Sequence, residues 1–143
     1  MEFEHVSVLL QESVDWLVTD PDGIYVDCTL GGAGHSQKIA SLLSVRGRLI
    51  GIDQDEEALA AAQERLAKAA CRVDIVKANF KDLASVLSRL QVQAVNGVLF
   101  DLGVSSHQLD MAERGFSYMH DGPLDMRMDQ QTEKTAAFVV NTY

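Results

Sequence analysis

The hydrophobic residues of this chain follow two alternating periods. Apolar positions with helical spacing predict a helix over residues 6–17, one marked by residues 39–43, one through residue 70 and one over residues 83–90. Short apolar runs between turn residues predict strands over residues 24–26, 48–52, 73–76 and 95–100. Strands and helices of moderate length therefore alternate along the first hundred residues.

This alternation predicts an α/β fold, in which a parallel sheet carries helices on both faces. In such sheets the ligand binds beyond the carboxyl ends of the strands. The polar residues that stand out in the pattern all come at such ends. They are Asp27 with the glycines behind it, Asp53, the pair Asn79-Phe80, and Asp101. We therefore expect one ligand site at the edge of the sheet that these residues share.

The pattern changes after residue 101. Residues 102–131 contain glycines, a proline and several methionines but no sustained period. An irregular segment of this length inside a compact domain is usually functional or disordered. Residues 132–143 have the pattern of a helix that has just begun.

Composition narrows the possible partners. The net charge is −9, with only 12 Lys and Arg among 143 residues. Nucleic-acid binding depends on basic contacts to phosphates, so this charge argues against a stand-alone nucleic-acid binder and favours a cationic or zwitterionic small ligand. The N-terminus has no basic region typical of a signal peptide, and no apolar run is long enough to cross a bilayer, so we expect a cytoplasmic protein without membrane contact. Cys28 and Cys71 are far apart in sequence and are expected to be buried thiols.

The segment Gly31-Gly32-Ala33-Gly34-His35 is the first candidate for chemistry. It lacks the Gly-Lys-Ser/Thr of a phosphate loop, and it lacks the third glycine of the dinucleotide fingerprint. A turn that needs positive φ is an equally good interpretation of the glycines alone. Asp53 favours the ligand interpretation, because a carboxylate at the end of the second strand can accept hydrogen bonds from both hydroxyls of a ribose.

Two further strand ends carry candidate residues. Phe80 can stack on a flat ring beside the polar Asn79, although a Phe covering the edge of the sheet is the competing interpretation. Asp101 is either a cap on the fourth strand or a site residue, and we favour the site. The four histidines share no metal-ligand spacing, so no metal site is predicted.

Several motifs together resemble the bacterial family that methylates the N4 atom of a cytidine in small-subunit ribosomal RNA (RsmH, also called MraW). The segments that carry the resemblance are HVSVLLQESV (5–14), DCTLGGAGHS (27–36), GIDQD (51–55), DLGVSSHQLD (101–110) and ERGFSYMHDGPLDMRMD (113–129). The resemblance implies a class I S-adenosylmethionine-dependent methyltransferase with a Rossmann-like parallel sheet. It also implies 16S rRNA in the small ribosomal subunit as the partner.

The resemblance assigns cofactor contacts residue by residue: Ala33, Gly34, His35, Asp53, Phe80, Asp101 and Gln108. Asp101 is also the candidate catalytic residue, because it can help to hold the target amine. Gln108 rests on the resemblance alone. Where the family often has glycine, this chain has Ala33, whose methyl is tolerated unless φ there is positive.

Length is the main departure from the family, whose members are much longer. We therefore expect an incomplete sheet, with residues 1–131 forming the N-terminal part of the methyltransferase domain and residues 132–143 starting a helical inserted domain. An incomplete sheet leaves the fourth strand as a free edge, which predicts a homodimer through that edge. Two alternatives stay open: a cofactor-binding half domain without activity of its own, and an NAD-dependent oxidoreductase.

Overall fold

A computed structural model describes residues 8–143. Four parallel strands form one sheet in the order β3-β2-β1-β4. The strands are β1 (Ile24–Asp27), β2 (Arg48–Asp53), β3 (Arg72–Lys77) and β4 (Gly97–Leu99). The predicted α/β parallel sheet is therefore confirmed. Because all four strands run the same way, the residues that follow β1, β2, β3 and β4 emerge at one edge of the sheet.

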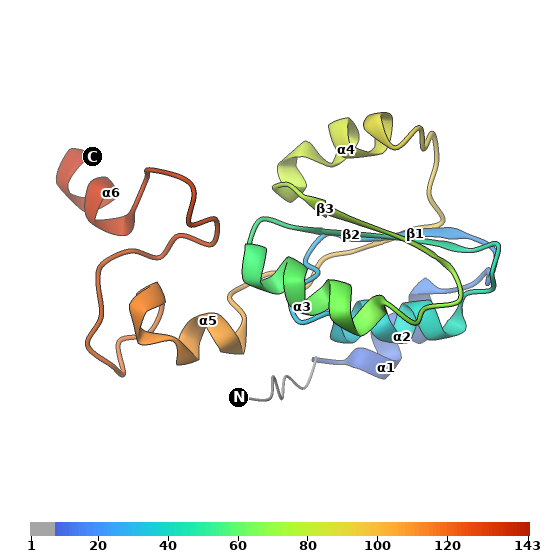
Figure 1. The fold of residues 1–143 in the computed structure, drawn as a ribbon, viewed down its shortest axis with the longest axis horizontal. Helices are drawn as coiled ribbons and strands as arrows, with labels where there is room; N and C mark the ends of the chain where they lie inside the picture. The colour runs from blue at the N-terminus through green and yellow to red at the C-terminus, as the bar shows by residue number, and fades with distance from the viewer. Residues whose placement is uncertain (1–7) are drawn as a thin grey trace. The chain divides into compact units, whose positions relative to one another are not determined.

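Successive residues of the central strands point to opposite faces, as the pleat of a strand requires. Tyr25 and Leu49 pack into one hydrophobic cluster, with residues of α1 (Leu10–Leu17), α2 (Gly34–Leu42) and α3 (Glu56–Leu66). Val26 and Ile50 pack into a second cluster, with residues of α4 (Leu83–Arg89). Figure 1 shows α4 covering one face and α1, α2 and α3 the other. The predicted helices on both faces are confirmed.

The helices differ from the prediction mainly at their ends. α1 begins at Leu10, because Leu9 has φ 50° and so cannot belong to the helix. The earlier start predicted at residue 6 lies outside the described residues. α3 begins after Asp55, whose side chain accepts a hydrogen bond from the Glu57 N–H, and this N-cap confirms the predicted one. α3 ends at Leu66 rather than residue 70, in a turn that buries Cys71 against the first cluster.

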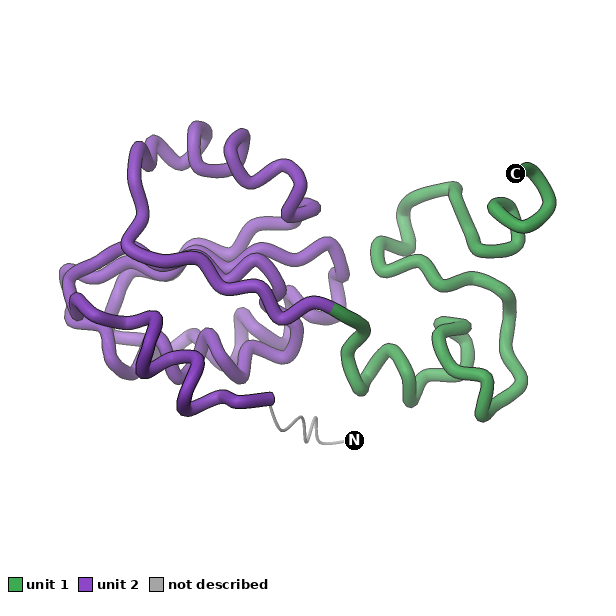
Figure 2. Tube along the Cα trace, turned by 180° about the vertical axis from the view of Figure 1, so that it is seen from behind, with its two compact units in different colours: residues 1–3, 103–143 green, residues 4–102 purple. Residues whose placement is uncertain are grey.

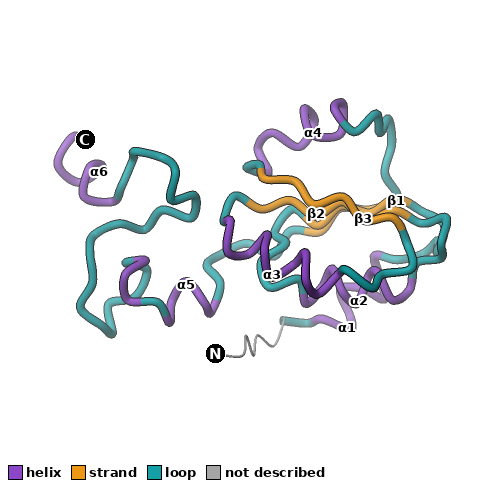
Figure 3. The backbone as a smooth tube through the Cα atoms, viewed as in Figure 1, coloured by secondary structure: helices purple, strands orange, loops and turns teal. Residues whose placement is uncertain are grey.

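The chain forms two compact units. One contains the described residues through Leu102, and the other contains residues 103–143 (Figure 2). The second unit is mostly loop, as the lack of period predicts, with the short helices η2 (Ala112–Arg114), α5 (Ser106–Asp110) and α6 (Ala136–Thr142) (Figure 3). The assignment of residues 132–143 to an inserted domain stays a prediction.

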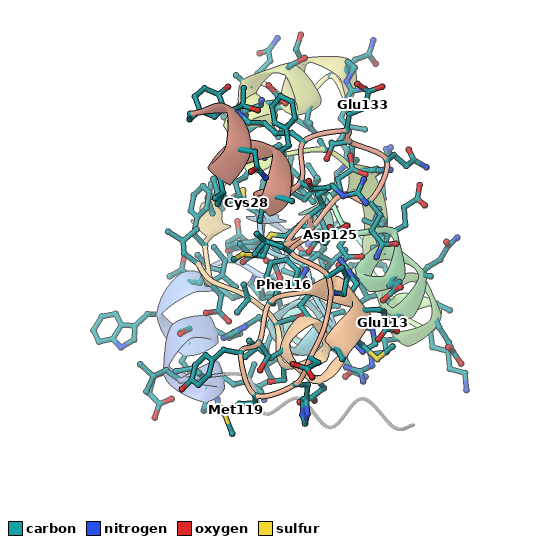
Figure 4. The ribbon with its side chains drawn as sticks, turned by 90° about the vertical axis from the view of Figure 1, so that its left-hand side faces the viewer. Cys28, Glu113, Phe116, Met119, Asp125 and Glu133 are labelled. Atoms are coloured by element: carbon teal, nitrogen blue, oxygen red, sulfur yellow. The ribbon has the colours of Figure 1, made fainter. Side chains whose placement is uncertain are left out.

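The irregular loop of the second unit is held by buried polar contacts. The Arg114 side chain is 1% exposed, and its guanidinium donates to the backbone oxygens of Arg127 and Met128. Asp125 accepts hydrogen bonds from the Arg127 guanidinium, whose Nε donates to Oδ1 at 2.9 Å and to Oδ2 at 3.2 Å and whose Nη2 donates to Oδ2 at 2.7 Å. Asp125 is labelled in Figure 4 and lies in the loop between η2 and α6. Contact with Arg127 holds the pKa of the Asp125 carboxyl below its usual range.

Candidate cofactor site

The glycine loop joins β1 to α2 and uses two left-handed residues. Gly31 has φ 46° and Ala33 has φ 61°. The interpretation of the segment as a turn with positive φ is therefore confirmed at Gly31. Because φ at Ala33 is positive, its methyl group is costly there: left-handed backbone costs a non-glycine residue about 1–2 kcal/mol. The Ala33 side chain is fully buried, so its packing offsets part of that cost.

Asp53 ends β2 and contacts the same loop. Its Oδ2 accepts a hydrogen bond from the Gly31 N–H at 2.8 Å, and its Oδ1 accepts from the Asp55 N–H at 3.0 Å. A carboxylate has about four acceptor positions, so these two bonds fix its orientation and leave acceptor capacity for a ligand. The half-buried carboxylate lies at the end of β2, and its contact with a ribose stays a prediction.

Asp27, the last residue of β1, holds the glycine loop through hydrogen bonds to residues on both sides of it. It is 1% exposed; its Oδ2 accepts from the Ser36 hydroxyl at 2.7 Å, and its Oδ1 accepts from the Thr29 N–H at 3.0 Å. Burial raises the pKa of the Asp27 carboxyl, although these hydrogen bonds oppose the rise. Thr29 Oγ1 in turn accepts from the Asp101 N–H at 2.8 Å. The loops after β1 and β4 are thereby joined. The sequence marks Asp27 as a strand-end acid, but no local pattern identifies Thr29 as the link.

His35 and Asp101 meet at this edge. His35 Nδ1 lies 3.8 Å from Asp101 Oδ2, and His35 Nε2 lies 3.2 Å from the Val8 backbone oxygen. The ring is buried, whereas the Asp101 side chain is 42% exposed. The two groups form an ion pair when the imidazole is protonated. Asp101 therefore presents a carboxylate to solvent, beside the start of α2.

Phe80 is the first residue of η1 (Phe80–Asp82) and comes three residues after Lys77, where β3 ends. Its ring meets the ring of Phe100, which follows β4, with centroids 5.7 Å apart and planes at 90°. Asn79 caps η1 and donates from Nδ2 to Gln54 at 3.0 Å, so it also joins the ends of β3 and β2. Both rings are partly exposed.

Gln108 belongs to the second unit, in α5. Its side chain is 5% exposed and completes a capping box with Ser105, whose N–H donates to Gln108 Oε1 at 3.1 Å. The other sequence-predicted site residues, Ala33, Gly34, His35, Asp53, Phe80 and Asp101, all lie in the first unit. The cofactor role of each of these residues, Gln108 included, stays a prediction.

Arg65 is a site-supporting residue that the sequence interpretation missed. It lies in the last turn of α3, and its Nη1 donates to the backbone oxygen of Gly32 in the glycine loop. A basic residue in the last turn of a helix is already explained by the helix dipole. The sequence therefore gives no separate signal for the contact of Arg65 with a loop residue 33 positions away.

The two cysteines are buried free thiols, as predicted. Burial and the neighbouring Asp27 raise the pKa of the Cys28 thiol to about 11. Cys28 is therefore protonated at neutral pH and is not an activated nucleophile.

The residues that meet in the first unit suit a nucleoside with a cationic tail. Asp53 offers a carboxylate that can accept from ribose hydroxyls, the partly exposed Phe80 and Phe100 rings offer apolar faces at 90° to each other, and Asp101 supplies negative charge. The first-turn N–H groups of α2 have no acceptors within the helix and add donors at this edge. Together, these acceptors, aromatic rings and N–H donors fit S-adenosylmethionine, whose sulfonium carries positive charge.

Asp27→Ala should destabilise the fold by about 2 kcal/mol, because the Ser36 hydroxyl, which is 0% exposed, loses its acceptor. Asp27→Asn keeps an acceptor and should cost less. Since burial raises the pKa in the folded state, the carboxyl contributes its full stability below its unfolded pKa of about 3.9 and loses stability as pH rises through the folded pKa. Urea unfolding from pH 4 to pH 8 should show this decline in the native chain and not in Asp27→Asn. Parallel pH profiles would contradict the assignment.

Comparison with known proteins gives the family. The model described as "MraW methylase family" matches residues 2–143. The chain is 57% identical over 143 residues to Ribosomal RNA small subunit methyltransferase H of Clostridioides difficile (strain 630). The aligned region covers 100% of this chain and 46% of that protein. The chain is 59% identical to the protein of the same name from Lachnospira eligens, with coverage of 100% and 45%. The chain thus spans a little under half the length of these curated relatives.

Solved structures agree on the fold. A proposed rRNA-methylase from Clostridium thermocellum superposes with a TM-score of 0.60 at 24% identity, over 70% of this chain and 54% of that one. An rRNA methylase from Streptococcus thermophilus gives a TM-score of 0.55 at 22% identity, over 69% and 57%. These identities support the fold alone, a class I Rossmann-like methyltransferase sheet. The family model itself matches residues 2–143, and on that match the chain belongs to the MraW methylase family.

Proposed function

We propose that the chain forms the methyl-donor site of an S-adenosylmethionine-dependent methyltransferase that modifies the N4 amino group of a cytidine in 16S rRNA. The observation that carries this proposal is the meeting of Asp53 with the glycine loop in a chain of this family, at the edge of the sheet where parallel α/β folds bind ligands. Relatives that are 57% and 59% identical to the chain over its 143 residues carry the name of an rRNA methyltransferase.

Bound S-adenosylmethionine would supply an electrophilic methyl group on a positively charged sulfur. The residues of this chain would hold and orient it. Asp53 accepts from the ribose hydroxyls, Phe80 packs against the adenine ring, and Ala33, Gly34 and His35 line the glycine loop beside it. Gln108 is a proposed contact on the family resemblance alone. Orientation of the two reactants contributes much of the rate in a direct transfer between them.

Asp101 is the proposed catalytic residue. A cytosine amino group is a weak nucleophile because its lone pair is delocalised into the ring. A carboxylate that accepts a hydrogen bond from this amino group holds its nitrogen in line with the methyl group. The partly exposed Asp101 carboxylate, fixed through its backbone N–H by Thr29 Oγ1, suits this role.

Two measurements test the proposal. Calorimetric titration with S-adenosylmethionine should show binding, and titration with NADH should not; the reverse result supports the oxidoreductase. A methyl-transfer assay on small ribosomal subunits then compares the chain with Asp101→Ala. Binding without transfer by this chain, together with transfer by a version extended to the length of its relatives, supports the half domain without activity of its own. Absence of transfer by both contradicts the proposed methyltransferase.

The proposed partner is 16S rRNA in the small ribosomal subunit, contacted mainly by the portion of the relatives that this chain does not cover. The chain itself carries 21 acidic residues and only 12 basic ones. Within residues 8–143, no helix is both long and apolar enough to cross a membrane. A cytoplasmic location stays a prediction.

Self-association through β4 is a separate prediction. β4 pairs with β1 on one side only and forms an edge of the sheet built by the described residues. Backbone groups on such an edge can pair with another strand. Sedimentation at increasing concentration should show a dimer that Val98→Pro weakens, because proline removes a backbone donor. A monomer at all concentrations would contradict this prediction.

A further inference from the structure

The aromatic pair at the site joins segments from opposite edges of the sheet. Phe80 follows β3 and Phe100 follows β4, and these strands are the two outer ones in the order β3-β2-β1-β4. Their rings nevertheless lie 5.7 Å apart, edge to face. The pair therefore extends across the carboxyl ends of the two central strands, on which the glycine loop and Asp53 stand.

Both rings belong to the α4 side of the sheet. Val98, two residues before Phe100, packs into the hydrophobic cluster that includes Val86 of α4, and Phe80 lies in the short helix that leads into α4. Val26, Ile50 and Ile52 of this cluster are 0% exposed, whereas Phe80 is 40% exposed and Phe100 is 47% exposed. Two partly exposed rings at the carboxyl ends of parallel strands, where such sheets bind ligands, are accessible to a flat ligand.

The contact geometry fixes the orientation of Phe80. An isolated Phe side chain on a short helix rotates about two bonds, and only some orientations offer its face to a flat ligand. An edge-to-face neighbour restricts that rotation, because the positive edge of one ring meets the negative face of the other. Phe100 is the ring within contact distance that performs this role for Phe80.

We propose that Phe100 is a positioning residue of the cofactor site, which holds the Phe80 ring in the plane that stacks on the purine. This inference rests on the proposed function. It goes beyond the cofactor contacts assigned by family resemblance, which include Phe80 and Asp101 but not Phe100.

A double-mutant cycle tests the proposal by calorimetric titration of the full chain with S-adenosylhomocysteine. Phe100→Leu keeps apolar bulk and should weaken binding about threefold to tenfold, the range that an edge-to-face contact supports. Phe100→Tyr keeps the ring and should bind within twofold of the native chain. In a Phe80→Leu background, Phe100→Leu should have little further effect, because the ring that it positions is gone.

The outcomes separate the two proposals. No binding by the native chain overturns the proposed function and this inference with it. Native binding with an unchanged Phe100→Leu affinity overturns the inference alone. Equal losses from Phe100→Leu in both backgrounds overturn positioning through Phe80, since independent effects add. Urea unfolding of each variant shows whether an affinity change follows a loss of stability instead; a loss explained fully in that way also overturns the inference.

Discussion

Asp53→Ala should weaken S-adenosylmethionine binding by about 100-fold or more. In the proposed complex, the carboxylate accepts hydrogen bonds from both ribose hydroxyls. Hydrogen bonds to charged groups contribute about 1.5–3 kcal/mol each, and 1.4 kcal/mol corresponds to a tenfold change in affinity. The two bonds that Asp53 already makes, to the N–H groups of Gly31 and Asp55, hold its oxygens in place before the ligand arrives. Such preorganisation increases the effect of losing the group.

Calorimetric titration of three variants measures this effect. Asp53→Asn keeps one acceptor oxygen and should lose about tenfold. Glu64→Ala is the matched control, because it removes one exposed carboxylate from α3, in the same unit, and should leave affinity unchanged. Because alanine also leaves the Gly31 N–H without its acceptor, urea unfolding should accompany each titration. An Asp53→Ala affinity within threefold of the native chain would falsify the ribose assignment.

The fold could be predicted because its signals are local. Apolar runs and helical spacing in sequence are sufficient to find the strands and helices, and alternation of the two implies parallel strands. The carboxyl ends then follow from topology, which is why Asp53, Phe80 and Asp101 could be assigned to one site before any coordinates. Element ends are less predictable: β4 is Gly97–Leu99 rather than residues 95–100, although Asn96 still bonds Ile24 at the start of β1, through its backbone N–H and through its side-chain oxygen.

The remaining features depend on contacts between residues far apart in sequence. Thr29 reaches the backbone of Asp101, and Arg65 reaches Gly32, through single hydrogen bonds that leave no sequence pattern. Phe100 looks like the last residue of an apolar strand, yet it lies beyond β4 and is partly exposed. Arg114 is misleading in the opposite direction, because arginine is almost never fully buried unless it is paired. Arg114 is buried because an irregular loop brings the backbone oxygens of Arg127 and Met128 to its guanidinium.

Gly115→Ala should disrupt the loop packing of the second unit, at a cost of about 4 kcal/mol. Gly115 has φ 72°, which costs a residue with a side chain about 1–2 kcal/mol. A Cβ there would also lie 2.2 Å from the Pro123 backbone oxygen and 3.0 Å from the Asp125 nitrogen. Neither backbone atom can turn away as a flexible side chain would. Overpacking of this kind adds about 1–3 kcal/mol.

Hydrogen exchange locates the damage. The Met126 N–H donates to the Arg114 oxygen, and the Ala137 N–H donates to the Leu124 oxygen, so both should lose protection in Gly115→Ala. Gly103→Ala is the matched control from the same unit, since Gly103 has φ 141° but a Cβ there meets no atom within 4 Å. It introduces backbone strain without overlap and should cost less. Equal protection in the two variants would show that the close approach of Gly115 to the 123–125 backbone does not hold this loop together, and that the buried Arg114 and its carbonyl partners are sufficient.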